Sequence, residues 1–278
     1  MSKYQGRRSG IPRGATAQTP GRTPGNRAPR HLLALYGLHA VEAALDNPRR
    51  EVVSVTATQA VARRLAPALA RRGLQARIAE SAEIGARLAE GAVHQGVVAE
   101  VKPLPPPTLA QIVPASPLIA LDQVTDPHNV GAILRSAAGF GAAAVIAPDR
   151  GAPAPSGALA KAASGALEHV PYVQITNLAR TLKELKRAGY WIFGLDGQAE
   201  TALETVAGHA PAVLVLGAEG GGLRRLTRQE CDVLVRIALP GKINSLNVSN
   251  AAAIALYALS RAATLGPQST DSTEIHQI

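Results

Sequence analysis

The chain has 278 residues, 46% of them hydrophobic, which is enough to fill one large or two modest domains and excludes disorder throughout. Its single cysteine, Cys231, excludes an internal disulfide and a multi-cysteine metal cage, and we expect it to be a buried small hydrophobe in a reducing compartment. No apolar run approaches the ~20 residues that span a bilayer, and the N-terminus has no apolar signal segment. These features predict a cytoplasmic protein with no membrane association.

The net charge of +9 is concentrated at the N-terminus. Residues 1–30 hold seven basic side chains and no acidic one, so residues 31–278 carry 22 basic and 20 acidic side chains, a net charge of only +2. The segment is also rich in Gly and Pro and cannot bury apolar surface. We predict a disordered basic arm over residues 1–31 that follows nucleic-acid phosphates. The alternative is a solubilising tail without a specific partner.

Residues 32–101 predict a small α/β domain, because short apolar stretches alternate between helical and strand-like periodicity. Helices are expected over 38–45, 59–72 and 82–90, and strands over 51–55, 74–78 and 96–101. Residues 102–116 contain the run Pro105-Pro106-Pro107, which can continue neither a helix nor an inner strand. We therefore place a domain linker there.

Residues 117–265 predict a second, larger domain with a parallel α/β architecture, followed by a tail over 266–278. Strands are expected over 118–122, 143–147, 170–175, 190–195, 213–216 and 233–237, and helices over 129–139, 157–168, 178–188 and 248–263. A short helix with capping-box spacing is expected at Thr227–Glu230. Open parallel sheets bind ligands at the carboxyl ends of their strands, so the loops there are the first place to look for a site.

The first such loop leads from Asp126 into a helix. Asn129 is expected at the helix N-cap, where its carboxamide could also hold a neighbouring loop or a ligand. Arg135 is expected opposite the apolar stripe of that helix, among Gly131, Ala132 and Gly139. These small neighbours would let a phosphate or ribose approach the guanidinium. The alternative for Arg135 is a surface salt bridge.

The second loop, residues 216–223, is dense in glycine and follows a buried strand directly. Glycine lets backbone amides and carbonyls approach a ligand, and Glu219 is the charged side chain within the loop. The loop is neither a Walker A sequence nor a GxGxxG in a first βα turn. A flexible turn with a solvated Glu219 is the alternative.

The third loop, residues 237–250, bends at Pro240 and Gly241 and precedes the last helix. Ser245, Asn247 and Ser249 stand at alternate positions, with Leu246 and Val248 between them. Helix capping would explain one of these three polar side chains. Their alternation indicates a loop that turns one face toward a ligand.

The three loops together resemble the SpoU/TrmH branch of the SPOUT superfamily, RNA ribose 2'-O-methyltransferases with a C-terminal trefoil knot. The matching motifs are Asn129 with Arg135 and the following Phe140-Gly141, the Leu-Gly-Ala-Glu-Gly run at 216–220, and Ser-Leu-Asn-Val-Ser at 245–249. The resemblance is close over residues 118–262. Residues 36–45 and 94–96 also resemble the small substrate-binding domain, similar to ribosomal protein L30e, of members that modify a guanosine in large-subunit ribosomal RNA.

The resemblance implies S-adenosylmethionine as cofactor, no metal, RNA as substrate and a homodimer. It assigns catalytic or site-shaping roles to Arg135, Asn129, Glu219, Ser245 and Asn247. It assigns cofactor binding to Leu216, Gly217, Ala218, Gly220, Ile237, Leu239, Leu246 and Ser249. One departure is that Pro240 stands two positions later than the proline that members often carry after the equivalent of Ile237, so we expect the detail of the cofactor loop to differ.

The chemistry leaves the role of Arg135 open. A ribose hydroxyl is a very weak acid, so its attack on a sulfonium methyl needs in-line geometry and help with its proton. Arginine is ordinarily protonated, so Arg135 either acts as an unusual base or stabilises the developing alkoxide as a cation.

Two alternative functions are a transfer-RNA methyltransferase and a non-catalytic RNA-binding assembly factor. Compact transfer-RNA members lack a separate N-terminal domain, which argues against the first alternative. The intact motif residues argue against the second. His39, His94 and Tyr36 are expected to have structural or RNA-contacting roles, with Tyr36 a possible stacking residue.

Overall fold

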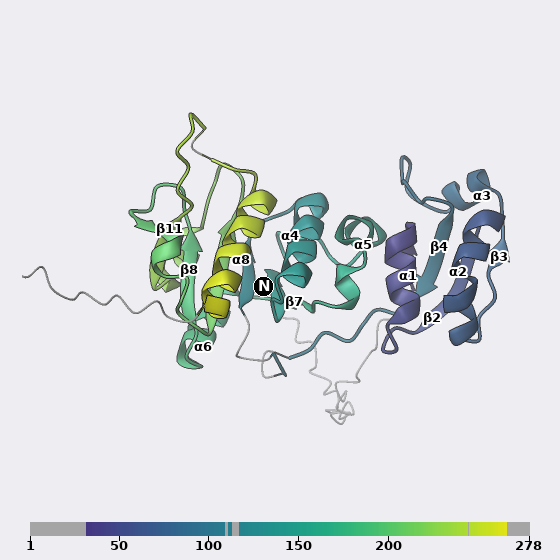
Figure 1. Ribbon diagram of the computed structural model, residues 1–278, viewed down its shortest axis with the longest axis horizontal. Coiled ribbons are helices and arrows are strands. Elements are labelled where there is room, and N and C mark those ends of the chain that lie inside the picture. Colours follow the sequence, from purple (N-terminus) through teal and green to yellow (C-terminus); the bar gives the residue numbers. More distant parts are fainter. Residues whose placement is uncertain (1–31, 109–110, 113–116, 244, 266–278) are drawn as a thin grey trace, which may run out of the picture. The chain divides into compact units, whose positions relative to one another are not determined.

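Two β-sheets organise the part of the chain that the structure, a computed structural model, describes: residues 32–108, 111–112, 117–243 and 245–265 (Figure 1). The predicted arm over 1–31 and the tail over 266–278 lie outside the described residues, as do parts of the predicted linker. We call residues 32–101, which carry the first sheet, the N-terminal block. Residues 117–265, which carry the second, are the C-terminal block.

The N-terminal block is a mixed four-stranded sheet with three helices. Its sheet has the order β1-β4-β2-β3, with β1 and β2 antiparallel to the central β4 and β3 parallel to β2. The elements are β1 (Leu33–Tyr36), α1 (Leu38–Asp46), β2 (Val52–Ala57), α2 (Gln59–Arg71), β3 (Arg77–Ile78), α3 (Ser81–Gly85) and β4 (Val97–Val101). Strand β1 was not expected, because four residues beside a helix start carry no clear period; its pairing with β4, more than sixty positions away, stabilises it.

The C-terminal block contains a parallel seven-stranded sheet in the order β7-β6-β5-β10-β8-β11-β9. Its strands are β5 (Leu118–Asp122), β6 (Ala144–Pro148), β7 (Tyr172–Ile175), β8 (Trp191–Leu195), β9 (Thr201–Ala202), β10 (Ala212–Gly217) and β11 (Val233–Arg236). Every residue of β5 and β6 is buried, as expected of strands covered on both faces. The predicted α/β class with a parallel sheet is confirmed, whereas the trefoil knot stays a prediction.

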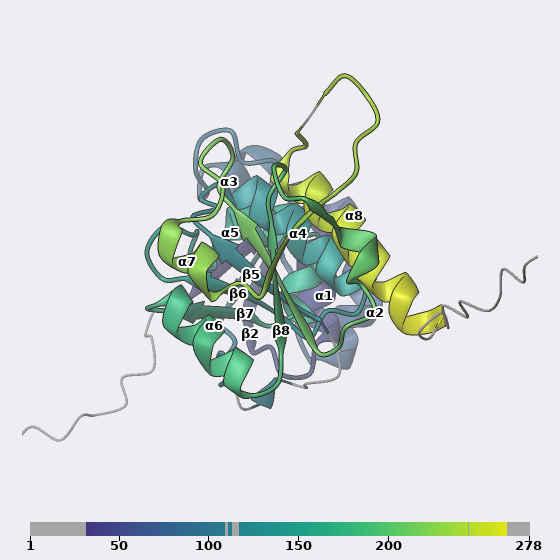
Figure 2. The same ribbon diagram turned by 90° about the vertical axis from the view of Figure 1, so that its left-hand side faces the viewer.

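Helices cover both faces of this sheet (Figure 2). On one face, α4 (Pro127–Gly139), α5 (Gly157–Ala163) and α8 (Val248–Leu265) pack over side chains such as Ile119, Leu121 and Leu214. On the other, α6 (Leu178–Arg187) covers the alternate positions, such as Leu118, Ala120 and Val213, and α7 (Arg225–Glu230) packs beside α6. This strict alternation follows from the two-residue period of a strand and leaves the strand ends as the accessible edges.

Cys231, at the end of α7, packs against the second of these cores and is partly rather than fully buried. Burial raises the pKa of its thiol to about 11, so the thiol stays protonated and unreactive near neutral pH.

Several local predictions were wrong, and the helix expected over 82–90 is reduced to α3, which ends at Gly85. The helix expected over 157–168 stops at Ala163, because Ser164 and Gly165 adopt left-handed conformations, and a 3₁₀ turn, η2 (Ala166–Glu168), follows. The N-cap of α4 is Asp126, whose carboxylate accepts a hydrogen bond from the His128 amide at 2.9 Å; Asn129 lies within the first turn. The capping box at Thr227 does not form, because α7 begins at Arg225 and Thr227 is a buried interior residue.

Candidate active site

The carboxyl ends of β5 and β10 lie side by side at the centre of the sheet. The two strands pair in parallel register, and the last pair is Asp122 with Gly217. The loop that leads to α4 and the glycine-rich loop therefore start next to each other. Such an edge, where neighbouring parallel strands lead away in different directions, is where ligands bind in open α/β sheets.

Three side chains, one from each predicted loop, meet at this edge. Asn247 donates from its amide nitrogen to Glu219 Oε1 at 2.6 Å and to Asn129 Oδ1 at 3.0 Å. Asn129 in turn donates to Glu219 Oε1 at 3.3 Å. The three residues are separated by up to 118 positions in sequence, yet they form one exposed to half-buried polar cluster, which we call the site cluster.

Asn247 is itself held in place by the start of α8. Its Oδ1 accepts hydrogen bonds from the Ser249 amide at 2.9 Å and from the Ser249 hydroxyl at 2.6 Å. This turn, in which an Asn side chain bonds the backbone two residues on, fixes the carboxamide that reaches Glu219. Ser249 therefore acts on the cluster through Asn247, while Ser245 lies exposed in the loop before it.

Arg135 lies further along α4 and is exposed. Within the described residues, no hydrogen bond or ion pair joins it to the site cluster or to an acidic side chain, so the alternative of a surface salt bridge gains no support. Its guanidinium presents its donors to solvent at the surface of α4.

The sequence-based reason for the small residues around Arg135 was wrong for Gly131. This glycine is buried, and a Cβ atom there would overlap Ala162 at the end of α5. Gly131 therefore serves the close approach of α4 to α5 rather than the approach of a ligand. Gly139, by contrast, faces open space.

The glycine-rich loop is a tight turn. Ala218 and Gly222 exchange backbone hydrogen bonds of 3.2 and 2.9 Å, and Gly220 and Gly222 have φ angles of 76° and 61°. A Cβ atom at Gly217 would overlap the backbone of Gly222. Glycine at these positions is thus required by the turn itself, and the turn places Glu219 near its tip.

Sequence reasoning missed an ion pair between a buried carboxylate and a half-exposed arginine, which anchors this turn. The Asp122 carboxylate, fully buried at the end of β5, accepts hydrogen bonds from Arg224 Nε at 2.6 Å and from the Arg224 amide at 2.8 Å. The signal was an aspartate ending the otherwise apolar strand 118–122, since a buried carboxylate needs donors. Arg224 connects the far side of the glycine turn to β5.

The third loop adds apolar surface beside the polar cluster. Ile237 and Leu239 are half-buried, while Leu246 is 37% exposed. Apolar side chains next to carboxamide and carboxylate groups suit a ligand with a flat apolar ring and a polar edge. The described residues contain no group of three or more His, Cys, Asp or Glu side chains that could hold a metal, and no described helix is long and apolar enough to cross a membrane.

Comparisons with known proteins follow the same division of the chain. Residues 116–257 match the model of the SpoU rRNA Methylase family, and residues 34–107 match a model described as RNA 2'-O ribose methyltransferase substrate binding. The chain is similar to the 23S rRNA (guanosine-2'-O-)-methyltransferase RlmB of Yersinia pestis, at 42% identity over 238 residues, which cover 82% of this chain and 96% of that protein. The corresponding protein of Photorhabdus laumondii is 43% identical over 236 residues, 80% and 95% of the two chains.

Solved structures support the fold. The SpoU methyltransferase AviRb from Streptomyces viridochromogenes, crystallised in complex with the cofactor AdoMet, superimposes with a TM-score of 0.72 at 24% identity, over 88% of this chain and 95% of that chain. A structure titled as an RNA 2'-O ribose methyltransferase gives a TM-score of 0.71 at 22% identity, over 87% and 93% of the two chains.

Proposed function

This chain belongs to the SpoU rRNA methylase family, and from that membership we propose that it transfers a methyl group from S-adenosylmethionine to the ribose 2'-hydroxyl of a guanosine in 23S ribosomal RNA. The observation that carries the proposal is the meeting of Asn129, Glu219 and Asn247, one from each family motif, at the carboxyl edge of the sheet. The similarity to relatives of that printed activity over more than four-fifths of the chain supports the substrate.

The residues around the glycine turn fit S-adenosylmethionine. The turn at Gly217, Ala218 and Gly220 has no side chain larger than a methyl group, and the loop at Ile237, Leu239 and Leu246 adds apolar surface for an adenine ring. Leu216 is the last buried residue of β10, and Ser249 sets the position of Asn247. When bound, the cofactor supplies a methyl group activated by a positively charged sulfur.

The protein's own residues provide orientation and charge. Methyl transfer forms a bond between the ribose 2'-oxygen and the methyl carbon, breaks the bond from that carbon to sulfur, and releases the hydroxyl proton. Arg135, exposed on α4, orients the phosphate beside the target ribose and stabilises negative charge on the 2'-oxygen; accepting the proton is the alternative role. Glu219, Asn129 and Asn247 hold the loops in one geometry, and Ser245 contacts the RNA.

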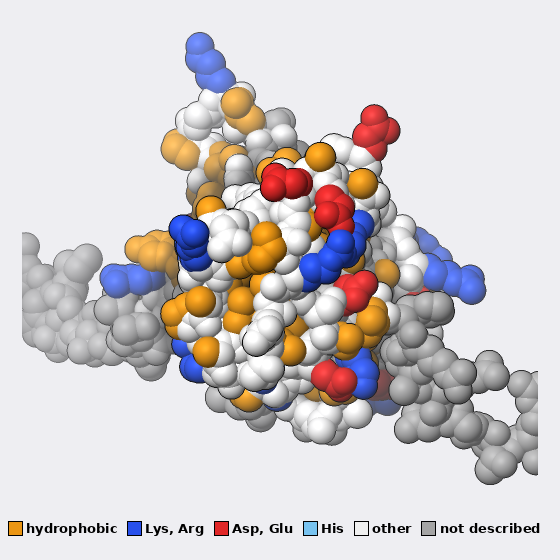
Figure 3. Space-filling model, turned by 90° about the vertical axis from the view of Figure 1, so that its right-hand side faces the viewer, with side chains coloured by type: hydrophobic (Ala, Val, Ile, Leu, Met, Phe, Trp, Pro, Cys, Tyr) orange, Lys and Arg blue, Asp and Glu red, His pale blue; other side chains and the backbone are white. Residues whose placement is uncertain are grey.

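The N-terminal block binds the RNA, and residues 102–116 link it to the methyltransferase domain over 117–265. The match of residues 34–107 to a substrate-binding model supports this division. On the face that includes β3, α2 and α3, acidic, basic and hydrophobic side chains are interspersed (Figure 3). Ion pairs on this face, such as Arg77 with Glu83, neutralise part of its charge. RNA recognition there thus depends on shape and individual contacts rather than on one basic patch.

The functional unit is a homodimer in the cytoplasm, where ribosomal RNA is modified. Helix α8 supports the dimer, because Ile254 and Tyr257 are 41% and 54% exposed on it. Exposed apolar side chains on one helix provide the type of surface that a second copy would cover.

The test is transfer of labelled methyl from S-adenosylmethionine to naked 23S ribosomal RNA and to bulk transfer RNA, followed by nuclease mapping. We expect label on the ribose of one guanosine of the ribosomal RNA. Label found only on transfer RNA would mean that transfer RNA, rather than ribosomal RNA, is the substrate. No label on either RNA, or on assembling large subunits, would leave a non-catalytic RNA binder and overturn the proposal.

A further inference from the structure

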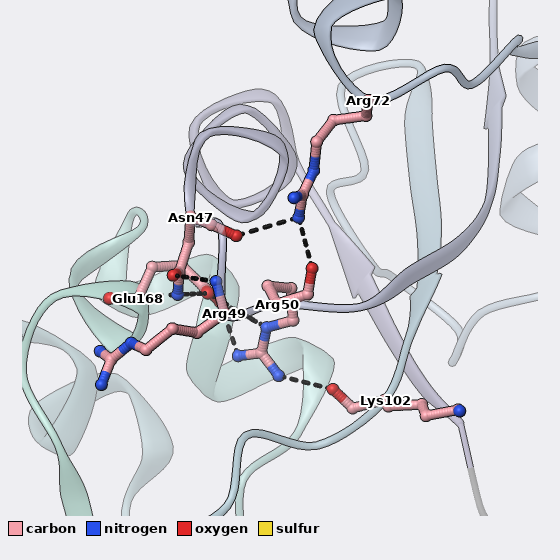
Figure 4. A network of polar contacts seen from close by, with 6 residues as sticks. All are labelled: Asn47, Arg49, Arg50, Arg72, Lys102 and Glu168. Carbon is pink, nitrogen blue, oxygen red and sulfur yellow. Dashed lines mark hydrogen bonds and ion pairs between the residues drawn. The ribbon is translucent and has the colours of Figure 1, made fainter.

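A buried ion pair joins the two blocks. Arg50, at the start of β2, donates from Nε and Nη2 to the Glu168 carboxylate of η2 at 3.0 and 2.6 Å. The side chains are only 4% and 2% exposed, and 118 residues separate them in sequence. Asn47, after α1, adds a donor to Glu168 Oε2 at 2.8 Å (Figure 4). We call Asn47, Arg50 and Glu168 the junction cluster.

The junction cluster also holds the chain where the linker begins. Arg50 Nη1 donates to the Lys102 carbonyl at 2.8 Å, and Arg72 donates to the carbonyls of Asn47 and Arg50. Figure 4 shows the Glu168 carboxylate and the Lys102 carbonyl at the Arg50 guanidinium, while Asn47 reaches Glu168 and Arg72 reaches backbone carbonyls. The cluster thus has its donors and acceptors satisfied among protein groups, and it needs no ligand to complete it.

Close backbone packing forms a second contact between the blocks, along α5. A Cβ atom at Gly37 would lie 2.5 Å from Lys161 Cδ, one at Gly157 would lie 2.7 Å from the Tyr36 ring, and one at Gly165 would lie 2.7 Å from Ala43 Cβ. The contacts at Gly157 and Gly165 need glycine and leave little room for sliding, whereas at Gly37 it is the φ of 89° that favours glycine, because the Lys161 side chain could shift. Tyr36 is therefore a packing residue against α5 in this structure, rather than an open stacking platform.

Lys161 completes this second contact. Its ammonium donates to the Gln95 side chain, which also accepts a hydrogen bond from the Leu38 amide at 3.1 Å. Burial lowers the pKa of Lys161, in keeping with its position against the N-terminal block. Gly37 and Gln95 belong to the segments whose sequence resembled the substrate-binding domain, so these motifs also serve the junction.

The hydrophobic cores overlap as well. Ala160 of α5 is buried in the core of the N-terminal block, and Leu167 of η2 packs against the cores of both blocks. Directional charge-assisted bonds at one end and glycine packing at the other fix a single orientation, because apolar contact alone would tolerate rotation.

We propose that Arg50, Glu168 and Asn47 are positioning residues, which fix the N-terminal block on α5 and η2 so that RNA bound there reaches the site cluster in one register. The effect on methyl transfer rests on the proposed function, whereas the fixed orientation of the two blocks does not depend on it. A 1 Å misplacement of a substrate can cost about 10²-fold in rate, so a loose junction would slow methyl transfer without preventing RNA binding.

The test measures the distance between the blocks in the full-length chain. Spin labels at Arg63→Cys on α2 and Lys183→Cys on α6, both exposed positions, are placed in a Cys231→Ser background. We expect one narrow distance distribution, which Glu168→Gln and Asn47→Ala broaden. Asp46→Asn, which removes the exposed ion pair with Arg71 nearby, should leave it narrow. If Glu168→Gln does not fold, Asn47→Ala decides the outcome, and an unchanged distribution overturns the proposal.

The catalytic readout is separate. With ribosomal RNA, Glu168→Gln or Asn47→Ala should lower kcat by about 10-fold or more with little change in KM, and S-adenosylmethionine affinity should stay the same. If these variants broaden the distance distribution but leave kcat unchanged, the positioning role is overturned. If the unmodified protein methylates no RNA, the proposed function fails while the distance measurement still decides the junction.

Discussion

Two clusters of similar composition serve opposite purposes in this molecule. Each pairs a glutamate with asparagine carboxamides: Glu168 with Asn47 at the junction, and Glu219 with Asn129 and Asn247 at the site. The Glu168 side chain is 2% exposed and is neutralised by Arg50, whereas Glu219 is exposed and, among the described residues, accepts hydrogen bonds from neutral donors only. The two clusters therefore differ in the presence of an arginine and in the burial of the glutamate, not in their glutamate and asparagine side chains.

The difference shows how to distinguish a structural cluster from a functional one. A buried carboxylate must have its charge balanced inside the protein, so the junction cluster is complete without a ligand. At the exposed edge, water can solvate Glu219, and its charge remains available to a bound molecule. An incomplete but ordered polar cluster at a strand edge is therefore the stronger indication of a binding site.

The largest effect is expected for Arg135→Ala, which tests the site side of the comparison. Because the guanidinium is assigned to charge development on the 2'-oxygen, methyl transfer should fall by about 10³-fold. Calorimetric affinity for S-adenosylmethionine should survive. Arg187→Ala, an exposed arginine on α6, is the matched control and should keep full activity. Parallel loss of cofactor binding in Arg135→Ala would contradict the assigned role.

Replacement by glutamine should mainly affect stability at Glu168 and mainly affect methyl transfer at Glu219. Glu168→Gln leaves a buried arginine without its counterion and should lower the free energy of unfolding in urea by about 3–5 kcal/mol. Glu219→Gln should change that free energy by less than about 0.5 kcal/mol, because the side chain is exposed, while lowering methyl transfer. Equal destabilisation by the two substitutions would remove the distinction between the clusters.

Two glycines on α4 allow a matched comparison of buried and exposed positions, with a smaller expected effect on stability. Gly131→Ala places a methyl group against Ala162, so we expect a loss of about 1–3 kcal/mol in thermal or urea unfolding. Gly139→Ala, on the same helix but in open space, should be neutral or stabilising by up to about 1 kcal/mol. A harmless Gly131→Ala would mean that α4 and α5 can move apart.

The smallest effect on methyl transfer itself is expected for residues 1–30, which hold seven basic side chains and lie in neither cluster, whereas residues 31–278 have a net charge of only +2. Deletion of residues 1–30 should weaken RNA binding mainly at low salt and make its salt dependence shallower. Filter binding at two salt concentrations would measure this. An unchanged affinity and slope would show that the segment does not contact RNA.

Sequence patterns were enough to predict the α/β class and most elements of the parallel sheet, because short continuous apolar runs mark buried strands and amphipathic helices have a clear period. The polar loops after the predicted strands, together with the resemblance to the SpoU/TrmH family, selected Asn129, Glu219 and Asn247. Local patterns were least informative where few residues decide the outcome, as at β1 and at the break between α5 and η2.

Which residues meet across the molecule follows from the folded chain alone. Asp122 with Arg224, and Glu168 with Arg50, are pairs separated by 102 and 118 positions, and no local period links their members. The same limit applies to glycine: sequence shows that Gly131 and Gly217 are small, but the neighbouring backbone shows that one serves helix packing and the other a turn. Burial changes the energy of a charge by several kcal/mol, and burial is a property of the folded chain.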